Sequence, residues 1–294
     1  MPEFLMKPKN DFVFKELMMD EQVRIGFLSV LLKLNPEDIK ETLILNTNLR
    51  KQYEKDKLGI LDVRILMNND TEIDIEIQLA TLNVWAERAL FYLAKMYTEQ
   101  IESGEDYDVF KKCVSISILG FKLFEDEPEF YSCFHIQEDT RHTLYTDKME
   151  FHVLELPKLP EELKDDSSDI ELWGRFINAE RKEEFDMVAE KNMFIKSAYK
   201  HLQIISQDDE KRMEYEAREK AIRDYNQGIL EATKRGLAEG ETRTEARGIQ
   251  ILIADHIEEN VPKEKTVTKL QKHYHLSKEE AEQYYEKVLE TIGV

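Results

Sequence analysis

The sequence predicts an α/β (α+β) fold, in which a mixed central sheet is flanked by helices and followed by an all-helical C-terminal region. Three observations lead to this prediction. Apolar and polar residues alternate over 59–79, as they do in a half-buried β-hairpin. Residues 113–121 (CVSISILGF) are nearly apolar on both faces, which is typical of a central strand. From about residue 170 the apolar residues recur at helical spacing to the end of the chain.

The composition is that of a folded and strongly acidic protein. Of the 294 residues, 41% are apolar and 35% are charged, and the net charge is −20. The apolar content is enough for a core, and the many charges with few Gly or Pro indicate much exposed helix. Proteins that bind phosphate backbones usually carry a surplus of basic residues, so this composition argues against tight non-specific binding to DNA. It does not exclude an enzyme that contacts DNA through a local basic patch and a metal ion.

The chain shows no signal for a membrane or for an oxidising compartment. No apolar run is long enough to cross a bilayer, and the start MPEFLMKPKNDF lacks the apolar core of a signal peptide. The only cysteines are Cys113 and Cys133, too few for a disulfide framework or a thiolate metal site. We therefore expect a cytoplasmic protein.

The N-terminal segment is predicted to be helical. Asn10 or Asp11 can cap a first helix, and apolar residues continue its pattern to about Leu34. The following Asn35-Pro36 should end this helix, because proline cannot continue the hydrogen-bond ladder. Residues 42–46 (TLILN) are short, β-branched and apolar enough to form a strand.

The hairpin at 59–79 (GILDVRILMNNDTEIDIEIQL) is the most informative stretch. Asn68-Asn69-Asp70 reads as the turn, and a turn centred on Asn69 places Arg64 opposite Asp74 and Asp62 opposite Glu76. Because side chains alternate along a strand, the odd and even positions face opposite sides of the sheet. The odd positions are apolar: Leu61, Val63, Ile65, Met67, Ile73, Ile75, Ile77 and Leu79. Most even positions are polar: Asp62, Arg64, Glu72, Asp74, Glu76 and Gln78.

Two interpretations of the polar face are open. In the first, Asp62 and Glu76 lie opposite each other with Cβ atoms about 5 Å apart. Two carboxylates at that separation repel unless a proton or a cation lies between them, and a hard divalent ion would serve, with Gln78 on the same face. In the second, the hairpin is an ordinary amphipathic pair whose polar face is solvated, and Arg64 forms a cross-strand ion pair with Asp74.

Basic residues around the hairpin are candidate DNA contacts. Arg88, on a helix predicted over about 81–102, would reach either the carboxylates or a phosphate, although pairing with a nearby acid is commoner for a helical arginine. Four more basic residues precede the hairpin: Arg50, Lys51, Lys55 and Lys57. This segment is either a DNA-contacting patch or a solvated loop.

Further strands are predicted at 113–121, 130–136, 143–145 and 151–155, which completes a sheet domain over about 1–160. Residues 161–207 should form short amphipathic helices that pack on that domain. Residues 208–294 should form a helical tail.

The tail contains a row of small residues at every fourth position: Gly228, Ala232, Gly236, Gly240, Thr244 and Gly248. Close helix–helix approach would explain the row, and a flexible, repeat-like tail is the alternative. The segment 277–280 (SKEE) fits a capping box that opens the last helix. That helix is rich in glutamate, which suits a DNA groove poorly, so we expect a dimerisation or docking role.

Several short segments together carry a family resemblance. In order along the chain they are 9–15 (KNDFVFK), 61–64 (LDVR), 75–78 (IEIQ), 87–92 (ERALFY), 100–107 (QIESGEDY) and 155–159 (ELPKL). With them, residues 6–160 resemble the Rpn family of recombination-promoting nucleases, also described as PD-(D/E)XK nuclease family transposases. The resemblance implies a restriction-endonuclease-like core, a mixed four-stranded sheet flanked by helices.

The resemblance also implies an activity and a site. The activity would be divalent-metal-dependent hydrolysis of phosphodiester bonds in DNA, linked to recombination, transposition or defence against foreign DNA. Asp62 would be the metal-binding aspartate and Glu76 the second acidic ligand, and Asp11 matches an acidic position on the first helix. The implied cofactor is Mg²⁺, with Mn²⁺ or Ca²⁺ as alternatives.

Gln78 departs from the common pattern, because many PD-(D/E)XK enzymes have a catalytic lysine there. Glutamine can orient a water molecule but cannot take its proton. The general base is then unassigned, with Lys57 or a second metal-bound water as substitutes. The alternative function is a weak or inactive nuclease relative that acts as a DNA- or protein-binding assembly module. In either case we expect a homo-oligomer formed through the C-terminal helices.

Overall fold

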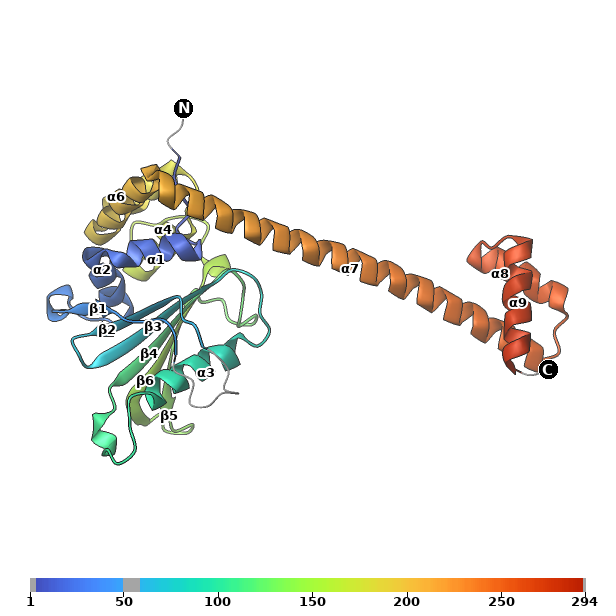
Figure 1. Cartoon of the computed structure of the whole chain (residues 1–294), viewed down its shortest axis with the longest axis horizontal. Helices are drawn as coiled ribbons and strands as arrows, with labels where there is room; N and C mark the ends of the chain where they lie inside the picture. Colours follow the sequence, from blue (N-terminus) through green and yellow to red (C-terminus); the bar gives the residue numbers. More distant parts are fainter. Residues whose placement is uncertain (1–3, 50–58, 293–294) are drawn as a thin grey trace. The chain divides into compact units, whose positions relative to one another are not determined.

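The computed structural model describes residues 4–49 and 59–292 (Figure 1). The chain forms two compact units, 1–219 and 220–294, which are described separately. Helix α7 (Asp209–Glu258) contributes to both units. The boundaries expected near residues 160 and 207 lie inside the first unit, and the assignment of roles to the three predicted segments stays a prediction.

A six-stranded mixed sheet forms the centre of the first unit, in agreement with the predicted fold class. Its strands are β1 (Thr42–Ile44), β2 (Val63–Met67), β3 (Thr71–Gln78), β4 (Lys112–Leu119), β5 (Tyr131–Gln137) and β6 (Leu144–Glu155). Their order across the sheet is β1-β2-β3-β4-β6-β5. β4 runs parallel to both of its neighbours, and the other pairs are antiparallel. The central position predicted for 113–121 is therefore confirmed, and β1 and β5 are edge strands on either side of the four inner strands.

The predicted register of the β2–β3 hairpin is confirmed. Arg64 is the Cα partner of Asp74, and Met67 is the partner of Thr71. Asn68 and Asn69 have φ of 50° and 57°, a left-handed conformation that asparagine tolerates better than most residues. The two asparagines thus fix the turn, and the turn fixes which side chains face which.

The prediction of one long N-terminal helix is wrong. The segment forms α1 (Asp11–Met19) and α2 (Glu21–Leu31), with Asp20 in an extended conformation between them. The Asp20 carboxylate accepts a hydrogen bond from the Val23 amide and so caps α2, which stabilises the break by about 1 kcal/mol. The predicted cap at the first helix is present, because Asn10 Oδ1 accepts from the Phe12 amide.

Two other elements differ from the prediction. Residues 143–145 and 151–155 are not separate strands, because β6 runs unbroken from Leu144 to Glu155. The helix after the hairpin, α3 (Trp85–Thr98), is shorter at both ends than the predicted 81–102. Leu61 precedes β2 and packs with α3, not with Val63 and the other odd positions, because the strand alternation begins only at residue 63.

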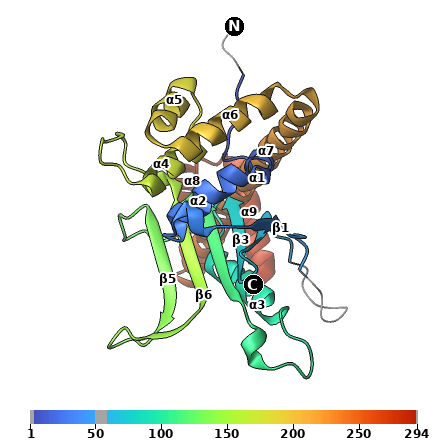
Figure 2. The same ribbon diagram turned by 90° about the vertical axis from the view of Figure 1, so that its left-hand side faces the viewer.

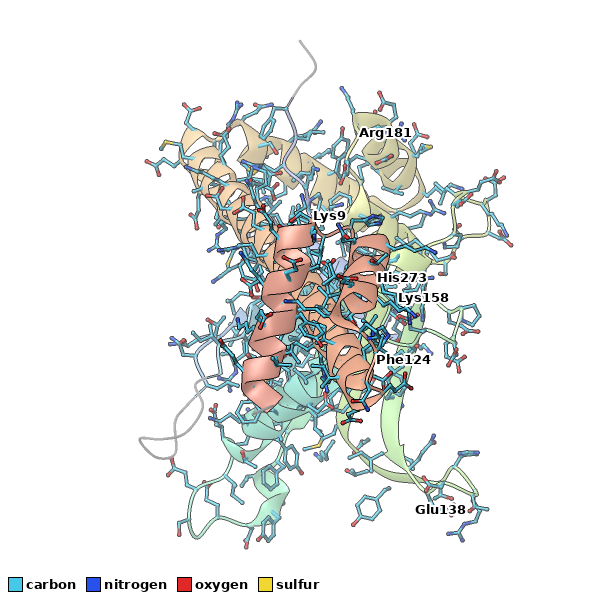
Figure 3. The ribbon with its side chains drawn as sticks, turned by 90° about the vertical axis from the view of Figure 1, so that its right-hand side faces the viewer. Lys9, Phe124, Glu138, Lys158, Arg181 and His273 are labelled. Carbon is cyan, nitrogen blue, oxygen red and sulfur yellow. The ribbon has the colours of Figure 1, made fainter. Side chains whose placement is uncertain are left out.

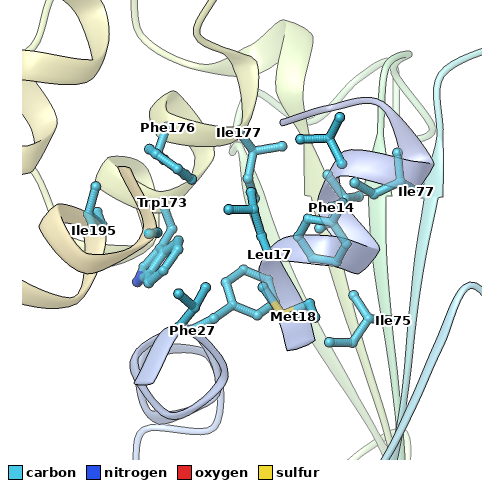
Figure 4. Packing of buried hydrophobic residues seen from close by; sticks show 14 of the residues in the cluster. Phe14, Leu17, Met18, Phe27, Ile75, Ile77, Trp173, Phe176, Ile177 and Ile195 are labelled. Atoms are coloured by element: carbon cyan, nitrogen blue, oxygen red, sulfur yellow. The ribbon is translucent and has the colours of Figure 1, made fainter. Parts of the chain in front are cut away.

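One face of the sheet shares a single core with Tyr215 of α7 and with five further helices (Figures 1, 2 and 4). These are α1, α2, α4 (Asp169–Asn178), α5 (Lys182–Lys191) and α6 (Met193–Gln207). Aromatic rings join the helices to one another: Phe27 of α2 lies edge-to-face against Trp173 of α4, with ring centroids 5.4 Å apart. Ile75 and Ile77 of β3 contribute to the same core, as the odd-position pattern predicted. The other face of the sheet is covered by α3.

The ELPKL segment lies where β6 ends, and it fixes a neighbouring loop. Glu155 is fully buried, and its carboxylate accepts from the Lys158 ammonium at 2.7 Å and from the Leu123 amide at 2.6 Å. Lys158 also donates to the Phe124 carbonyl at 2.7 Å, and both residues are labelled in Figure 3. Each charge is therefore paired and hydrogen-bonded, as a buried ion pair requires.

The second unit has its own small core. The end of α7, α8 (Lys263–Tyr274) and α9 (Lys278–Ile292) enclose a cluster of buried side chains: Ile249, Ile253, Val267, Leu270, Ala281 and Val288. The predicted capping box is confirmed, because the Glu280 amide donates to Ser277 Oγ and the Ser277 amide donates to Glu280 Oε2.

The row of small residues lies within α7, which is helical throughout, and flexibility of this segment stays a prediction. A Cβ atom added at Gly228, Gly236 or Gly240 would meet nothing within 4 Å. The described part of the chain thus contains no close helix–helix approach at these three glycines. Within that part, no helix is long and apolar enough to cross a membrane.

Candidate active site

The face of β3 that carries the acidic residues is buried. Glu72, Asp74 and Glu76 are 6%, 0% and 3% exposed. The interpretation of a solvated polar face is therefore wrong for this strand. The reason is tertiary, since α3 lies across this side of the sheet and closes it from solvent with Tyr92 and Leu93.

The predicted ion pair between Arg64 and Asp74 is also wrong. Although the two residues are Cα partners, the Arg64 guanidinium forms an ion pair with Glu72 and a second one with Glu99 Oε2 at 3.3 Å. Glu99 follows the last turn of α3, so packing of this helix adds an acceptor that the hairpin alone lacks. The Asp74 carboxylate is left without the arginine that its register position suggested.

Asp74 is the least compensated acid of the site. Neither of its carboxylate oxygens has a hydrogen-bond partner among the described residues. Burial, followed by the nearby charges of Glu76 and Asp62, raises the pKa of Asp74 well above its ordinary value. A buried carboxylate in this situation must hold a proton or share a cation.

Asp62 and Glu76 are locked together across the hairpin. The Asp62 amide donates to Glu76 Oε1 at 2.9 Å, and the Ile77 amide donates to Asp62 Oδ2 at 3.0 Å. Burial and the adjacent Asp62 charge raise the pKa of Glu76 to about 8. Burial also raises the pKa of Asp62. The structure thus brings the two sequence-predicted acids together and adds Asp74 to them, giving a group that we call the acid trio: Asp62, Asp74 and Glu76.

Among the described residues, Arg88 forms an ion pair with the acid trio. Its Nη2 lies 3.7 Å from Glu76 Oε2, which is too long for a hydrogen bond. The guanidinium lies over the rings of Trp85 and Tyr92, 5.4 Å and 5.2 Å from their centroids. Of the two roles considered for Arg88, the structure shows the one directed at the carboxylates, and contact with a phosphate stays a prediction.

Asp11 and Gln78, the other predicted site residues that the structure describes, have partners outside the acid trio. Asp11 begins α1 and forms an ion pair with Arg218 at 2.7 Å, and its charge contributes to the raised pKa of Asp62. Gln78 donates from Nε2 to the Ala80 carbonyl at 2.8 Å. The predicted DNA contacts Lys51, Lys55 and Lys57, together with Arg50, lie outside the described residues.

Sequence reasoning missed three kinds of residue at this site. Asp74 could have been found, because acids at three successive even positions of β3 must share one face of the sheet. Lys15 of α1 acts electrostatically on Asp62, which only the packing of α1 reveals. Ser115 and Ser117 of β4 are the buried Cα partners of Asp74 and Glu76 and complete the floor of the site.

The donor set fits a hard divalent cation. The acid trio offers only carboxylate oxygens, which Mg²⁺, Mn²⁺ and Ca²⁺ prefer. The unpartnered oxygens of Asp74 and the raised pKa values of Asp62 and Glu76 are what such an ion would relieve.

Comparison with known proteins gives one family. Residues 8–232 match the sequence model of the family described as PD-(D/E)XK nuclease family transposase, which is more than half of the chain. No curated protein and no solved structure matches the chain. The family match covers both the acid trio and the helices that pack on the opposite face of the sheet.

Proposed function

Since the chain belongs to the PD-(D/E)XK nuclease family transposases, we propose that it is a divalent-metal-dependent DNA endonuclease whose centre is the acid trio. The observation that carries this proposal is the burial of three carboxylates for which the described residues supply one ion-pairing arginine, Arg88. A structural ion-pair network would pair each acid, as Arg64 does for Glu72 and Glu99. Within 4–49 and 59–292, the acid trio has an ion pair only at Glu76, which supports a role in holding a cation.

Asp62 and Glu76 would hold the metal ion, with Asp74 behind them. When bound, a divalent ion polarises a phosphate oxygen and lowers the pKa of a coordinated water. Backbone hydrogen bonds fix one carboxylate oxygen of Asp62 and one of Glu76. The Ile77 amide holds Asp62 Oδ2, and the Asp62 amide holds Glu76 Oε1. These backbone bonds orient both carboxylates without using a competing cation.

In this proposal Arg88 would bind phosphate. Its guanidinium is held on the faces of Trp85 and Tyr92, so little side-chain entropy remains to be lost on binding. A metal ion on Glu76 would replace Arg88 as the partner of that carboxylate. Arg88 would then be available for the scissile phosphate, to which its forked donors are suited.

The general base of the proposed reaction must be a group other than Gln78. Gln78 cannot accept the proton of a nucleophilic water, and its amide nitrogen is already bonded to the Ala80 carbonyl. Lys15 joins Lys57 and a second metal-bound water as a candidate, because its charge acts on Asp62. The Lys15→Met variant tests whether Lys15 is the general base. Loss of cleavage with retained metal binding would support that role for Lys15, and unchanged cleavage would exclude it.

Plasmid nicking tests the nuclease proposal. We expect the full-length protein to nick supercoiled DNA in Mg²⁺ or Mn²⁺, and Asp62→Asn and Glu76→Gln to abolish this activity while keeping the size of each side chain. Glu72→Gln is the matched control, because Glu72 lies on the same strand and face but is paired with Arg64. If the wild-type protein nicks no more than Asp62→Asn, the proposal fails. Metal-independent binding of the same DNA would then favour the alternative of an assembly module.

We further propose that the C-terminal helices make the protein a homo-oligomer. A truncation that tests this should end at Glu219, because Tyr215 is buried in the core of the first unit and Arg218 pairs with Asp11. Light scattering should show a smaller assembly for residues 1–219 than for the full chain. An unchanged number of subunits would refute a role for the tail in association.

A further inference from the structure

A second group of metal-ligating side chains lies at the edge of the sheet formed by β5 and β6. It consists of Cys133 from β5 and of Glu150 and His152 from β6. Their ligand atoms all lie within 4.8 Å of one another. A fourth side chain, His135 of β5, borders the group: its Nδ1 is 4.0 Å from the Cys133 sulfur and its Nε2 is 3.4 Å from Glu150 Oε2.

This group is separate from the acid trio and lies on the other face of the sheet. Glu150 and His152 are the Cα partners of Val114 and Ile116, which face the core beneath α1 and α2. Asp74 is instead the partner of Ser115, one residue out of phase. Since side chains alternate along a strand, the two groups project in opposite directions.

The spacing of the donors suits one tetrahedral ion. The Cys133 sulfur is 3.6 Å from Glu150 Oε1, and His152 Nε2 is 2.7 Å from the same oxygen. Ligands bound to zinc at their usual bond lengths are separated from one another by about 3.3–3.6 Å. The sulfur and carboxylate are therefore already at that separation, and the imidazole needs a movement of less than about 1 Å.

His152 provides the second, independent observation. It is 1% exposed, and its Nε2 lies 2.7 Å from Glu150 Oε1 but has no hydrogen-bond partner among the described residues. Its Nδ1 is 2.7 Å from the Tyr131 hydroxyl. When Nδ1 carries the proton and donates to that hydroxyl, the Nε2 lone pair faces Cys133 and Glu150. An outer hydrogen bond that fixes the tautomer in this way is usual for a metal-bound histidine.

An ion pair alone does not account for the group. Lys112 pairs with Glu150 Oε2, while Oε1 faces the sulfur and the imidazole. Lys112 thus accounts for one carboxylate oxygen, while the other oxygen, the imidazole and the thiol face one another.

We propose that Cys133, Glu150 and His152 bind one Zn²⁺ ion, with His135 as the fourth ligand. A mixed set of sulfur, nitrogen and oxygen donors is suited to zinc and unsuited to Mg²⁺. Binding replaces the thiol proton of Cys133, which is released to solvent, by a bond from sulfur to the metal. Two cysteines are too few for a site built from thiolates, but a mixed site needs only one.

The ion would join the edge strand β5 to β6. The pairing of these strands shifts register immediately beyond His135, between His135 and Ile136 and again between Ile136 and Gln137. The hairpin continues to a turn at Glu138, labelled in Figure 3. A metal ion bound by ligands from both strands would therefore hold the hairpin at the point where regular pairing ends.

The test uses the full-length protein, freed of metal with a chelator and then loaded with Zn²⁺ or Co²⁺. We expect about one zinc per chain to be retained through desalting, and a sulfur-to-metal charge-transfer band in the cobalt form. Cys133→Ser should lose both. Cys113→Ala is the matched control, because Cys113 is buried on the opposite face, next to Gln100. Asp62→Asn should also retain zinc, which separates this site from the acid trio.

A second variant and a thermal measurement complete the test. Zn²⁺ should raise the melting temperature of the wild type and of Cys113→Ala but not that of Cys133→Ser. His135→Ala changes an exposed side chain and should weaken zinc binding about tenfold or more without unfolding the protein. The proposal is overturned if no zinc is retained, if Cys133→Ser retains it, or if the cobalt form lacks the sulfur band.

Discussion

Replacing Glu76 by glutamine should stabilise the metal-free protein while it abolishes the proposed activity. Glutamine keeps the oxygen that accepts from the Asp62 amide, so the backbone contact across the hairpin is retained. It removes a buried carboxylate that lies beside Asp62 and Asp74. The effect should depend on pH, because the destabilisation arises only when Glu76 ionises.

The direction and size follow from the pKa of Glu76. Burial and the Asp62 charge raise the pKa of Glu76 from 4.5 to about 8 in the folded protein. The folded state therefore holds this proton more tightly than the unfolded state. Protonated Glu76 contributes its full stabilisation at pH values below its unfolded-state pKa of 4.5, and this stabilisation is lost as the pH rises through its folded-state pKa of about 8. Between about pH 5 and pH 8 the metal-free wild type should lose about 3.5 kcal/mol of unfolding free energy through this group.

Urea denaturation in the presence of a chelator measures this loss. The wild type should unfold at a markedly lower urea concentration at about pH 8 than at about pH 5. The difference between the two urea midpoints should be much smaller for Glu76→Gln. Mg²⁺ should restore stability to the wild type at the higher pH, because a cation relieves the same repulsion as a proton. Glu76→Gln should gain little from Mg²⁺.

Glu72→Gln supplies the control for this measurement. Glu72 lies on the same face of β3, and the Arg64 guanidinium pairs with it. This variant should keep both the pH dependence and the gain from Mg²⁺. The reasoning is refuted if Glu76→Gln retains the full pH dependence of the wild type, or if Mg²⁺ stabilises it equally.

Three further predictions concern the fold. Arg24→Lys should cost about 3 kcal/mol of unfolding free energy in urea titrations, because lysine cannot replace a guanidinium that donates to three carbonyls and to the Thr42 hydroxyl; a loss below about 1 kcal/mol contradicts this. Gly26→Ala should cost about 2 kcal/mol or more, since its Cβ would lie 2.2 Å from that of Phe194, whereas Gly228→Ala, with nothing within 4 Å, should raise helix stability by about 0.5–1 kcal/mol. Circular dichroism on heating compares the two, and equal effects would refute the packing argument. Ser277→Ala should destabilise the second unit by about 1 kcal/mol through loss of the capping box, and Ser277→Asp, which can still cap, should not.

The register of the hairpin could be predicted because it depends on local chemistry. Asparagines at 68 and 69 accept positive φ, and once the turn is placed, strand alternation decides every facing pair. The same locality explains the caps at Asn10 and Ser277. Each is a hydrogen bond between residues two or three apart, so no information about the rest of the fold is needed.

The partner of Arg64 could not be predicted, because it depends on a helix that approaches from elsewhere in the chain. A long side chain on a strand reaches diagonal neighbours as easily as direct ones, and α3 adds Glu99 to the available acceptors. Burial of the polar face has the same origin. The alternating pattern of β3 shows which side chains share a face, but only the position of α3 shows that the face is closed to solvent.

The break at Asp20 shows a different limit of the sequence pattern. Apolar residues continue at helical spacing through both α1 and α2, so periodicity alone reads them as one helix. The competing local structure is a cap formed by the Asp20 carboxylate, whose gain of about 1 kcal/mol is small beside the packing of two short helices on the sheet. Either helix arrangement satisfies the local pattern, and the core decides between them.

The acid trio connects stability to function, and the group of Cys133, Glu150 and His152 does the same. A fold selected for stability alone would replace Asp74 by asparagine or an apolar residue, because its buried oxygens have no partners among the described residues. The same reasoning applies to His152, whose Nε2 is buried and unpartnered on the opposite face. Substitutions that stabilise the metal-free protein and remove metal binding at each site would show that both arrangements are maintained for their ligands.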